Sequence, residues 1–227
     1  MQHSVKVYDL STFTILDFPD KPACIVWLAG CNMRCPYCHN PDIVFGKNEK
    51  DFNEVLSFLK KRRRVLEGVV ISGGEPTNDK NIFFICRKIK ELGYEIKIDT
   101  NGSNPKTIKR LIEEKLVDFI ALDFKASRKK YEKVTGKDFF EKTLESLKII
   151  NESEIPFEVR TTVHTDLLDE KDMEEISEIL KDIGCRGNYF IQNFVDSGKT
   201  LRKLPPQKRI LDISSLNLSF NAGYRNF

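Results

Sequence analysis

Hydrophobic and polar positions follow two alternating periods along this chain. Short apolar runs rich in β-branched residues are separated by longer stretches in which apolar residues recur every three or four positions. In the stretch 169–183, for example, Met173, Ile176, Leu180 and Ile183 fall on one helix face. The predicted strands are Ala23–Ala29, Val69–Ser72, Glu95–Asp99, Phe119–Phe124, Phe157–Val163 and Tyr189–Phe194, and the predicted helices lie near 51–66, 79–92, 105–115, 138–151 and 169–183.

Local signals support these boundaries. Asp51 with Glu54 is a plausible capping box at a helix start, and Gly93 and Gly184 stand where helices should end. Strands that alternate with helices through short loops pair in parallel, with the helices packed outside. We therefore expect an α/β fold, a partial (β/α)6 TIM-like barrel with parallel strands.

The chain has no low-complexity segment and no linker, so we expect one domain over residues 1–227. Its core spans 20–195, and a C-terminal extension covers 196–227, where the alternating pattern fades into a loop. Within the extension we expect an edge strand near Ser215–Phe220 and a frayed terminal strand over Phe220–Arg225.

Charged residues occupy one face of several predicted strands. Alternation puts Asp123 and Lys125 together on one strand, and Glu158 and Arg160 together on another. If the apolar face lies under the helices, this face lines the barrel lumen, which should then be wet or hold a polar ligand. The alternative is that salt bridges such as Arg160 to Asp123 or Glu158 fill the lumen.

Composition changes this picture little. With 40% hydrophobic and 31% charged residues in 227, the chain is an ordinary globular one, and a net charge of +3 is too mild to favour nucleic acid as a partner. The basic block Lys60–Arg64 indicates a solvent-exposed helix face. The alternative is a surface that docks an acidic partner. No apolar run is long enough to cross a bilayer and no targeting segment is evident, so we expect a cytoplasmic protein without a membrane partner.

Three cysteines in eight residues are the main candidate for chemistry. Cys31, Cys35 and Cys38 form a C-x3-C-x2-C loop that can bring three thiolates to one metal centre. A four-iron cluster is usually held by four cysteines, so a loop with three leaves one iron open for chemistry. A zinc clip that adds His39 remains an alternative, although adjacent side chains at 38 and 39 point apart. The remaining cysteines are expected to be small buried hydrophobes: Cys24, Cys86 and Cys185.

A glycine-rich turn follows the second predicted strand. Gly73 and Gly74 allow close backbone approach to a ligand, Glu75 is placed to anchor the turn, and Pro76 stiffens it. The cysteine loop followed by this turn resembles the motif pair of the radical S-adenosylmethionine superfamily. The resemblance covers most of the chain. The resemblance implies the partial barrel, a 4Fe–4S cluster on Cys31, Cys35 and Cys38, and S-adenosylmethionine chelated by the open iron.

The same resemblance implies the other cofactor contacts. Tyr37 would lie against the adenine, and the turn Gly73–Glu75 would receive the methionine ammonium group. The remaining positions carried over are His39 in the Cys-His-Asn-Pro string, Asp99 and Asn101 in Asp-Thr-Asn-Gly, Asp123 and Lys125 in Asp-Phe-Lys, and Arg160 as a carboxylate partner. For Asn101 a plain turn with Gly102 is an equal alternative. In the family, the two aspartate segments can hold a monovalent cation beside S-adenosylmethionine.

Finer motifs resemble the glycyl-radical-enzyme activases. The segments Thr14–Pro19 and Ala29–Pro41 are most similar to anaerobic ribonucleoside-triphosphate reductase activating proteins. We therefore expect a radical enzyme that removes a glycine Cα hydrogen from an anaerobic ribonucleotide reductase, fed by a flavodoxin or ferredoxin. The alternatives are activation of another glycyl radical enzyme such as pyruvate formate-lyase, a small-molecule radical enzyme, and a non-catalytic zinc scaffold or electron carrier.

Overall fold

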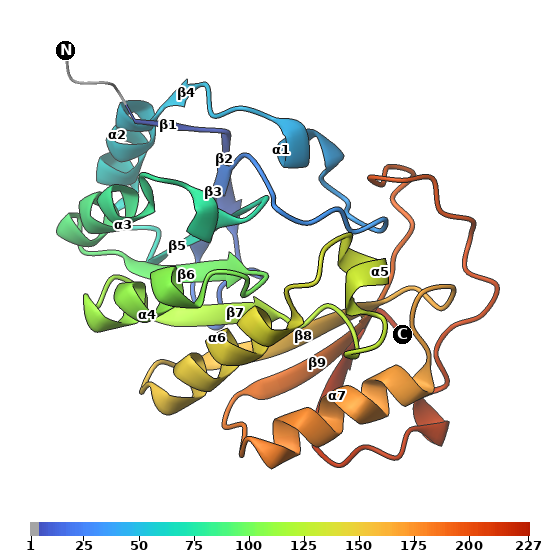
Figure 1. The fold of residues 1–227 in the computed structure, drawn as a ribbon. Helices are drawn as coiled ribbons and strands as arrows, with labels where there is room; N and C mark the ends of the chain where they lie inside the picture. Colours follow the sequence, from blue (N-terminus) through green and yellow to red (C-terminus); the bar gives the residue numbers. More distant parts are fainter. Residues whose placement is uncertain (1–4) are drawn as a thin grey trace. The chain divides into compact units, whose positions relative to one another are not determined.

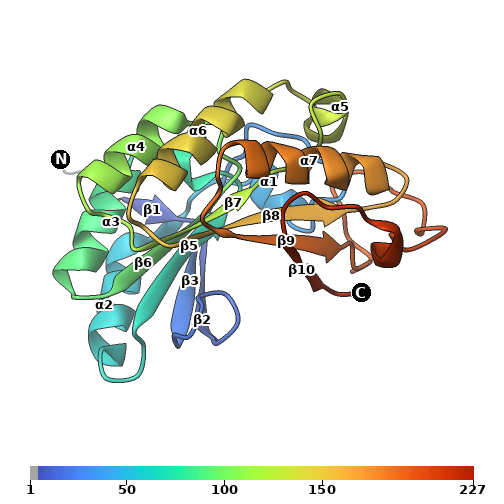
Figure 2. The same ribbon diagram turned by 90° about the horizontal axis from the view of Figure 1, so that it is seen from below.

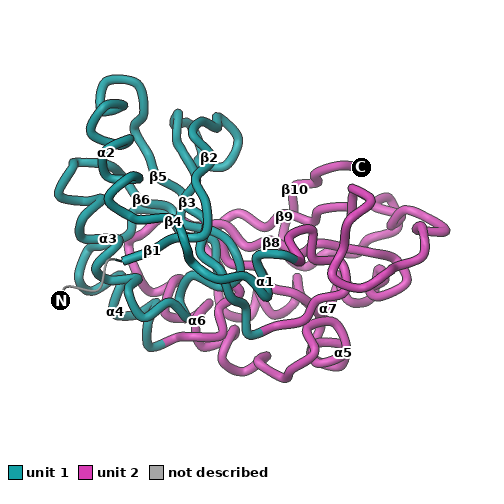
Figure 3. The backbone as a smooth tube through the Cα atoms, turned by 90° about the horizontal axis from the view of Figure 1, so that it is seen from above, with its two compact units in different colours: residues 1–32, 42–100, 106–120 teal, residues 33–41, 101–105, 121–227 magenta. Residues whose placement is uncertain are grey.

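The computed structural model describes residues 5–227, which divide into two compact units (Figure 3). Unit 1 holds the described residues up to Asn32, together with Asp42–Thr100 and Lys106–Ile120. Unit 2 holds Met33–Pro41, Asn101–Pro105 and Ala121–Phe227. The single domain over residues 1–227 stays a prediction.

Unit 1 is built on parallel strands that begin at the first buried apolar run. Strand β3 (Ala23–Leu28) pairs in parallel with β5 (Gly68–Gly73), which pairs in parallel with β6 (Glu95–Thr100). Strand β2 (Asp9–Thr14) adds to β3 in the antiparallel sense. A separate two-stranded ladder joins β1 (Lys6–Val7) and β4 (Lys50–Asp51).

The three longer helices of unit 1 lie where the 3.6-residue period predicts them, whereas the five-residue helix at Pro41–Phe45 was not predicted. Helices α2 and α3 lie side by side, where Phe52 and Phe84 meet edge to face with ring centroids 6.5 Å apart (Figures 1 and 2). The Asp51 side chain caps α2 by accepting from the Asn53 amide, and Gly93 ends α3 with a φ of +80°. The elements are α1 (Pro41–Phe45), α2 (Phe52–Arg62), the 3-10 turn η1 (Pro76–Asn78), α3 (Ile82–Glu91) and α4 (Pro105–Glu113).

Unit 2 continues the α/β pattern. Strand β7 (Phe119–Asp123) runs into it from unit 1, and the strand order there is β7, β8, β9, β10. Strands β8 (Phe157–Val163), β9 (Asn188–Asn193) and β10 (Ala222–Arg225) pair in parallel. Helices α6 (Phe140–Glu152) and α7 (Glu170–Asp182) cover one face of β8 and β9 (Figure 2), and the short elements are α5 (Tyr131–Thr135) and η2 (Ile213–Ser215).

Each unit has its own apolar core. In unit 1, Phe18, Ala23, Ile25 and Val70 are buried together, with Trp27 and Phe119 packed against them. In unit 2, Phe124, Tyr131 and Phe140 form an edge-to-face aromatic cluster with centroids 5.6–6.5 Å apart. These cores fix the strands whose ends carry the candidate residues.

The predicted α/β fold with mostly parallel strands is confirmed, and the six predicted strands and five predicted helices are all present within a few residues. Over residues 5–227 the strands do not close into a barrel, because β2 pairs only with β3 and β10 only with β9. No helix among these residues is long and apolar enough to span a membrane.

The prediction of an edge strand near Ser215–Phe220 is wrong, whereas the predicted terminal strand is present as β10. Residues 213–215 form η2 instead, because the Asp212 carboxylate accepts from the Ser214 amide and tightens the chain there. Strand β10 requires Gly223, since a Cβ at that position would stand 2.7 Å from the Phe190 ring. The antiparallel strand β2 was not predicted.

Candidate functional site

The glycine turn after β5 is joined to the backbone that leads into Cys31. The Gly74 amide donates to the Leu28 carbonyl at 2.9 Å, and the Glu75 amide donates to the Gly30 carbonyl at 2.8 Å. A Cβ on Gly73 would stand 2.1 Å from the Leu28 oxygen, and Gly73 has a φ of +132°. A Cβ on Gly74 would stand 2.0 Å from the Gly30 oxygen. The two glycines are therefore required by the chain's own backbone at the root of the cysteine loop, apart from any ligand.

Glu75 anchors this turn, as predicted. Its side chain is 2% exposed, and its Oε1 atom accepts from the Thr77 amide (3.1 Å), the Thr77 hydroxyl (2.5 Å) and the Thr100 hydroxyl (2.7 Å). The carboxylate thus caps η1 and ties it to the end of β6. Sequence reasoning missed both threonines. The signal for Thr77 is its place two residues after an acidic cap, whereas Thr100 gives no local signal.

Asn48 is a second residue that the sequence did not reveal. Its Oδ1 atom accepts from the Ala29 amide at 2.8 Å, and its Nδ2 atom donates to Asp79 at 2.8 Å. The next amide, that of Gly30, donates to the Ile43 carbonyl at 2.8 Å. These bonds hold the backbone immediately before Cys31. A lone asparagine in a loop carries no pattern that would have predicted this role.

In unit 2, Cys35 and Cys38 lie at the two ends of one tight turn. The Cys38 amide donates to the Cys35 carbonyl at 3.1 Å, so the two side chains leave the same turn. Cys35 is 7% exposed and Cys38 is half-buried. The Arg34 amide donates to the carbonyl of Thr135 at the end of α5 at 2.6 Å, which fixes the entry to this turn.

Tyr37, between these cysteines, carries a buried polar atom without a partner. The residue is 4% exposed, and no residue in the described range 5–227 offers its hydroxyl a hydrogen bond. Burial, and next the neighbouring Cys35, raise the pKa of this hydroxyl well above its usual value. A buried hydroxyl in this state is costly, so the site is suited to a ligand or water that supplies the missing bond.

Charged side chains from β7, its following residues and β8 form an ion-pair network beside Tyr37. Asp123 accepts from Lys125 Nζ at 3.0 Å and from Arg160 Nε at 2.9 Å, and Arg160 also lies 3.6 Å from Glu158. Burial alone would raise the pKa of Asp123, but Arg160 and then Lys125 outweigh it and lower the pKa to about 2. Burial would lower the pKa of Lys125, yet Asp123 and then Tyr37 raise it well above its usual value. The salt-bridge alternative from the sequence is thus present.

The C-terminal strand extends this network. Arg225 of β10 donates to Glu158 at 2.9 Å, and its guanidinium stacks 3.6 Å from the Phe190 ring centroid. Glu158 is 5% exposed, so a buried carboxylate receives two cations. Sequence reasoning had no signal for Arg225, because the contact joins residues far apart in the chain.

The segment 99–102 divides between the two units. In unit 1, Asp99 pairs with the buried Lys97 at 2.5 Å. In unit 2, the Asn101 side chain accepts from the Ser103 amide at 2.9 Å, Thr143 donates to the Asn101 carbonyl at 3.1 Å, and Gly102 has a φ of +73°. The plain turn that the sequence left as an equal alternative for Asn101 is present, and the cofactor contact stays a prediction.

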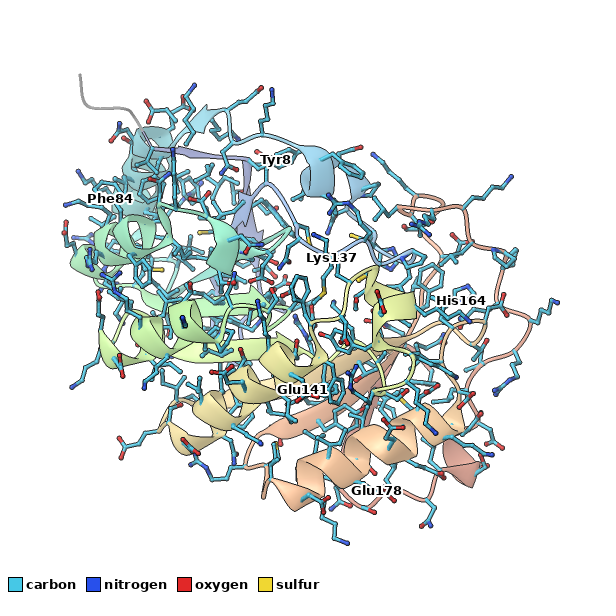
Figure 4. All side chains as sticks on the ribbon, viewed as in Figure 1. Tyr8, Phe84, Lys137, Glu141, His164 and Glu178 are labelled. Atoms are coloured by element: carbon cyan, nitrogen blue, oxygen red, sulfur yellow. The ribbon has the colours of Figure 1, made fainter. Side chains whose placement is uncertain are left out.

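His39 faces residues that follow β9. Its ring stacks on Phe194 with centroids 5.1 Å apart and an interplanar angle of 11°, and its Nδ1 atom lies 3.0 Å from the Ser197 hydroxyl. Burial lowers the pKa of His39 below its usual value. Phe194 also contacts His164, which lies directly after β8 (Figure 4).

The other cysteines differ from the loop cysteines. Cys24 and Cys86 are fully buried free thiols, and burial raises the pKa of each to about 12. Burial also raises the pKa of Cys185. These thiols are inert hydrophobes, as predicted.

The donor chemistry of the loop fits an iron–sulfur cluster. Thiolates are the ligands of such clusters, and Cys35 and Cys38 leave one turn. Within residues 5–227, however, no three Cys, His, Asp or Glu side chains are arranged to hold a single metal ion. The hydroxyl of Tyr37, a residue between the two cysteines in sequence, adds a polar position for a bound group.

Comparison with known proteins agrees with this arrangement. Residues 25–183 match the Radical SAM superfamily. A Methanocaldococcus jannaschii protein named "Putative glycyl-radical enzyme activating enzyme" is 36% identical over 216 residues, which cover 89% of this chain and 85% of that protein. The 7-carboxy-7-deazaguanine synthase of Aquifex aeolicus is 34% identical over 83 residues, or 36% of this chain and 37% of that protein.

Among solved structures, Streptococcus suis SuiB bound to the precursor peptide SuiA is similar, with a TM-score of 0.65 and 18% identity over 79% of this chain. The chain spans 40% of the length of SuiB, so this likeness concerns the fold.

The chain belongs to the radical S-adenosylmethionine superfamily and is an enzyme. Membership of this superfamily implies a 4Fe–4S cluster and S-adenosylmethionine as cofactors.

Proposed function

We propose that this protein activates a glycyl radical enzyme, and that its target is an anaerobic ribonucleotide reductase. The similarity to the M. jannaschii protein over 85% of that protein's length carries the proposal. When bound, the reduced cluster would supply one electron to break a C–S bond of S-adenosylmethionine, which would give methionine and a 5′-deoxyadenosyl radical able to take the Cα hydrogen of a glycine in the partner. A flavodoxin or ferredoxin would provide the electron, and the cytoplasm would be the place of action.

In this proposal, each candidate residue binds or orients a cofactor. Cys31, Cys35 and Cys38 hold the cluster, and the ring of Tyr37 lies against the adenine. The backbone turn Gly73–Glu75 receives the methionine ammonium group through its carbonyls, while the Glu75 side chain keeps the turn in place through the threonines that it binds.

The charged residues orient the polar ends of S-adenosylmethionine. Arg160 binds the carboxylate of S-adenosylmethionine, and its pair with Asp123 holds the guanidinium in a fixed direction. Lys125, Asp99, Asn101 and His39 complete the proposed set.

The proposal also includes a monovalent cation near Asp99 and Asp123. Each carboxylate already has an ion-pair partner, Asp99 with Lys97 and Asp123 with Lys125 and Arg160. The cation would therefore have to compete with these pairs, and the contacts give it no support. Titration of potassium against the affinity for S-adenosylmethionine tests this part by itself.

A small-molecule radical reaction is the second candidate. The similarity to a 7-carboxy-7-deazaguanine synthase over 83 residues favours it. The two candidates differ in whether the radical needs a macromolecular partner.

The test begins with anaerobic reconstitution of the cluster, followed by dithionite reduction and quantification of 5′-deoxyadenosine. Cys35→Ser should abolish the product, whereas Cys185→Ser, at a buried thiol with no proposed role, should retain it. Addition of an anaerobic ribonucleotide reductase should then give a glycyl radical doublet in electron paramagnetic resonance. Product without a glycyl radical in any such reductase would refute the target and leave another glycyl radical enzyme or the small-molecule reaction.

A further inference from the structure

The segment after β9 is long and irregular, and it lies against the cysteine loop. Residues 194–212 contain no helix or strand and leave β9 as the orange-red loop of Figure 1. The Leu201 amide donates to the Cys38 carbonyl at 3.0 Å, and the Arg202 amide donates to the Pro36 carbonyl at 3.2 Å. Long irregular loops in compact folds usually have a function. We call Phe194–Arg202 the clamp segment.

Side chains add to these backbone bonds. Phe194, which is 6% exposed, stacks on the ring of His39, and the Ser197 hydroxyl lies 3.0 Å from His39 Nδ1. The clamp segment therefore contacts three of the four residues from Pro36 to His39. The Cys35–Cys38 turn bond, the Arg34–Thr135 bond before it and these contacts all hold this stretch within unit 2.

The clamp segment is itself fixed at its start. The Phe194 amide donates to the Val163 carbonyl at 2.9 Å, and the Phe194 ring packs on His164 with centroids 5.0 Å apart. His164 is fully buried, and its Nε2 atom lies 3.1 Å from the Pro205 carbonyl. Gln207 Nε2 donates to the Phe194 carbonyl at 3.2 Å.

A second anchor lies beyond the clamp segment. Arg209 forms a two-armed ion pair with Glu170 at the start of α7, with distances of 2.5 and 2.8 Å. Contacts with β8 and α7 thus fix the position of the clamp segment. The clamp segment in turn contacts Cys38 and holds it in place.

We propose that Phe194 and His39 are positioning residues that, through the clamp segment, hold the backbone between Cys35 and His39 in the conformation that binds the cluster. The proposal rests on the proposed function only in that this loop holds a cluster. Stacking of the two rings fixes the residue next to Cys38, and the two backbone bonds fix the carbonyls on either side of Tyr37. Loss of the stack should let this half of the loop open, so that the cluster becomes accessible to solvent.

The first arm of the test uses the protein without cluster. Hydrogen exchange of the Leu201, Arg202 and Cys38 amides reports directly on opening of the clamp. In Phe194→Ala these amides should exchange roughly tenfold faster, a factor that corresponds to about 1.4 kcal/mol. His39→Phe keeps a stacked ring but loses the Ser197 contact, so in this variant the same amides should exchange faster than in wild type but more slowly than in Phe194→Ala. Val195→Ala, at an exposed position of the same segment, is the matched control.

The second arm uses the reconstituted protein. Iron release to an excess of chelator should be about tenfold faster in Phe194→Ala than in wild type and in Val195→Ala. The resonance spectrum of the reduced cluster should broaden in the same variant, whereas a role in general stability alone would leave that spectrum unchanged.

The proposal is overturned if the Leu201 and Arg202 amides exchange at the wild-type rate, or if β8 exchanges faster to the same degree. Wild-type iron release from Phe194→Ala would also overturn it. Failure of the wild-type protein to hold a cluster would instead refute the proposed function, and the exchange arm would still decide whether the clamp exists.

Discussion

Replacement of Tyr37 by phenylalanine should stabilise the protein without cofactors and weaken its binding of S-adenosylmethionine. The hydroxyl is buried and has no hydrogen-bond partner among residues 5–227. A buried, unsatisfied polar group costs about 1–3 kcal/mol, and the substitution removes that cost while it keeps the ring. Tyr37→Phe should therefore raise the free energy of unfolding by about 1–2 kcal/mol. For a chain of this length, 1 kcal/mol shifts the melting temperature by about 2–4 °C.

The matched control is a tyrosine whose hydroxyl is satisfied. Tyr94 is 1% exposed and donates to the Leu59 carbonyl at 2.7 Å. Tyr94→Phe removes the same atom but breaks a buried hydrogen bond, so it should lower the free energy of unfolding by about 1 kcal/mol. Urea unfolding monitored by circular dichroism on both variants gives the two signs in one experiment.

Measurement of S-adenosylmethionine binding distinguishes a Tyr37 hydroxyl that binds a cofactor from one that is only buried and unsatisfied. If a bound cofactor supplies the missing bond, Tyr37→Phe should reduce the affinity for S-adenosylmethionine about three- to tenfold, since a neutral hydrogen bond is worth about 0.5–1.5 kcal/mol. Isothermal titration of the reconstituted protein measures this. A destabilised Tyr37→Phe variant would refute the reasoning, because it would mean that the hydroxyl is already satisfied in the protein without cofactors.

Three further predictions follow from the turn after β5 and from the ion-pair network. Gly74→Ala should lower the free energy of unfolding by about 3 kcal/mol, because its Cβ would stand 2.0 Å from a backbone carbonyl oxygen. The control is Gly198→Ala, where the Cβ has open space, and it should lower the free energy of unfolding by only about 1–2 kcal/mol. Urea unfolding measures both. Thr100→Val should lower the free energy of unfolding by about 1.5–3 kcal/mol, because the buried Glu75 carboxylate loses a 2.7 Å hydrogen bond; an unchanged unfolding midpoint would contradict the role given to this bond. The pKa of Asp123 is lowered to about 2, so its ionised form stabilises the protein above its unfolded pKa near 3.8, and this contribution is lost as the pH falls toward 2. The stability difference between wild type and Asp123→Asn, about 2 kcal/mol at pH 6, should shrink over that range; a difference that is the same at pH 6 and pH 2.5 would exclude Asp123 as its source.

Much of the fold follows from the sequence alone. The run Ala23–Ala29 is apolar enough to be a buried strand in any arrangement, Phe157–Val163 alternates as a strand with one apolar face does, and helix ends such as Gly93 are fixed by local backbone geometry. The strand predicted near Ser215–Phe220 is absent because specific contacts overrode the local sequence pattern. That stretch alternates like a strand, but a side chain–backbone bond at Asp212 and the ring of Phe190 decided where the last strand lies.

The candidate site divides in the same way. Residue types and spacing along one short segment were sufficient to single out the cysteine loop, the glycine turn and Glu75, although the contacts that hold the turn reach Leu28, Gly30 and Thr100, which are distant in sequence. The roles of Asn48, Thr100 and Arg225 depend on partners 19 to 67 positions away. No local pattern encodes such a partner.

The sequence by itself thus determined the class of protein, because three closely spaced thiols and a glycine turn are chemical requirements that only a few residue types meet. Only the tertiary structure decided how those residues are held: Gly74 against the Gly30 carbonyl, Asp123 between two cations, and His39 against Phe194. These contacts depend on which strand ends meet in space. That is a property of the packed chain, and burial gives each contact its strength.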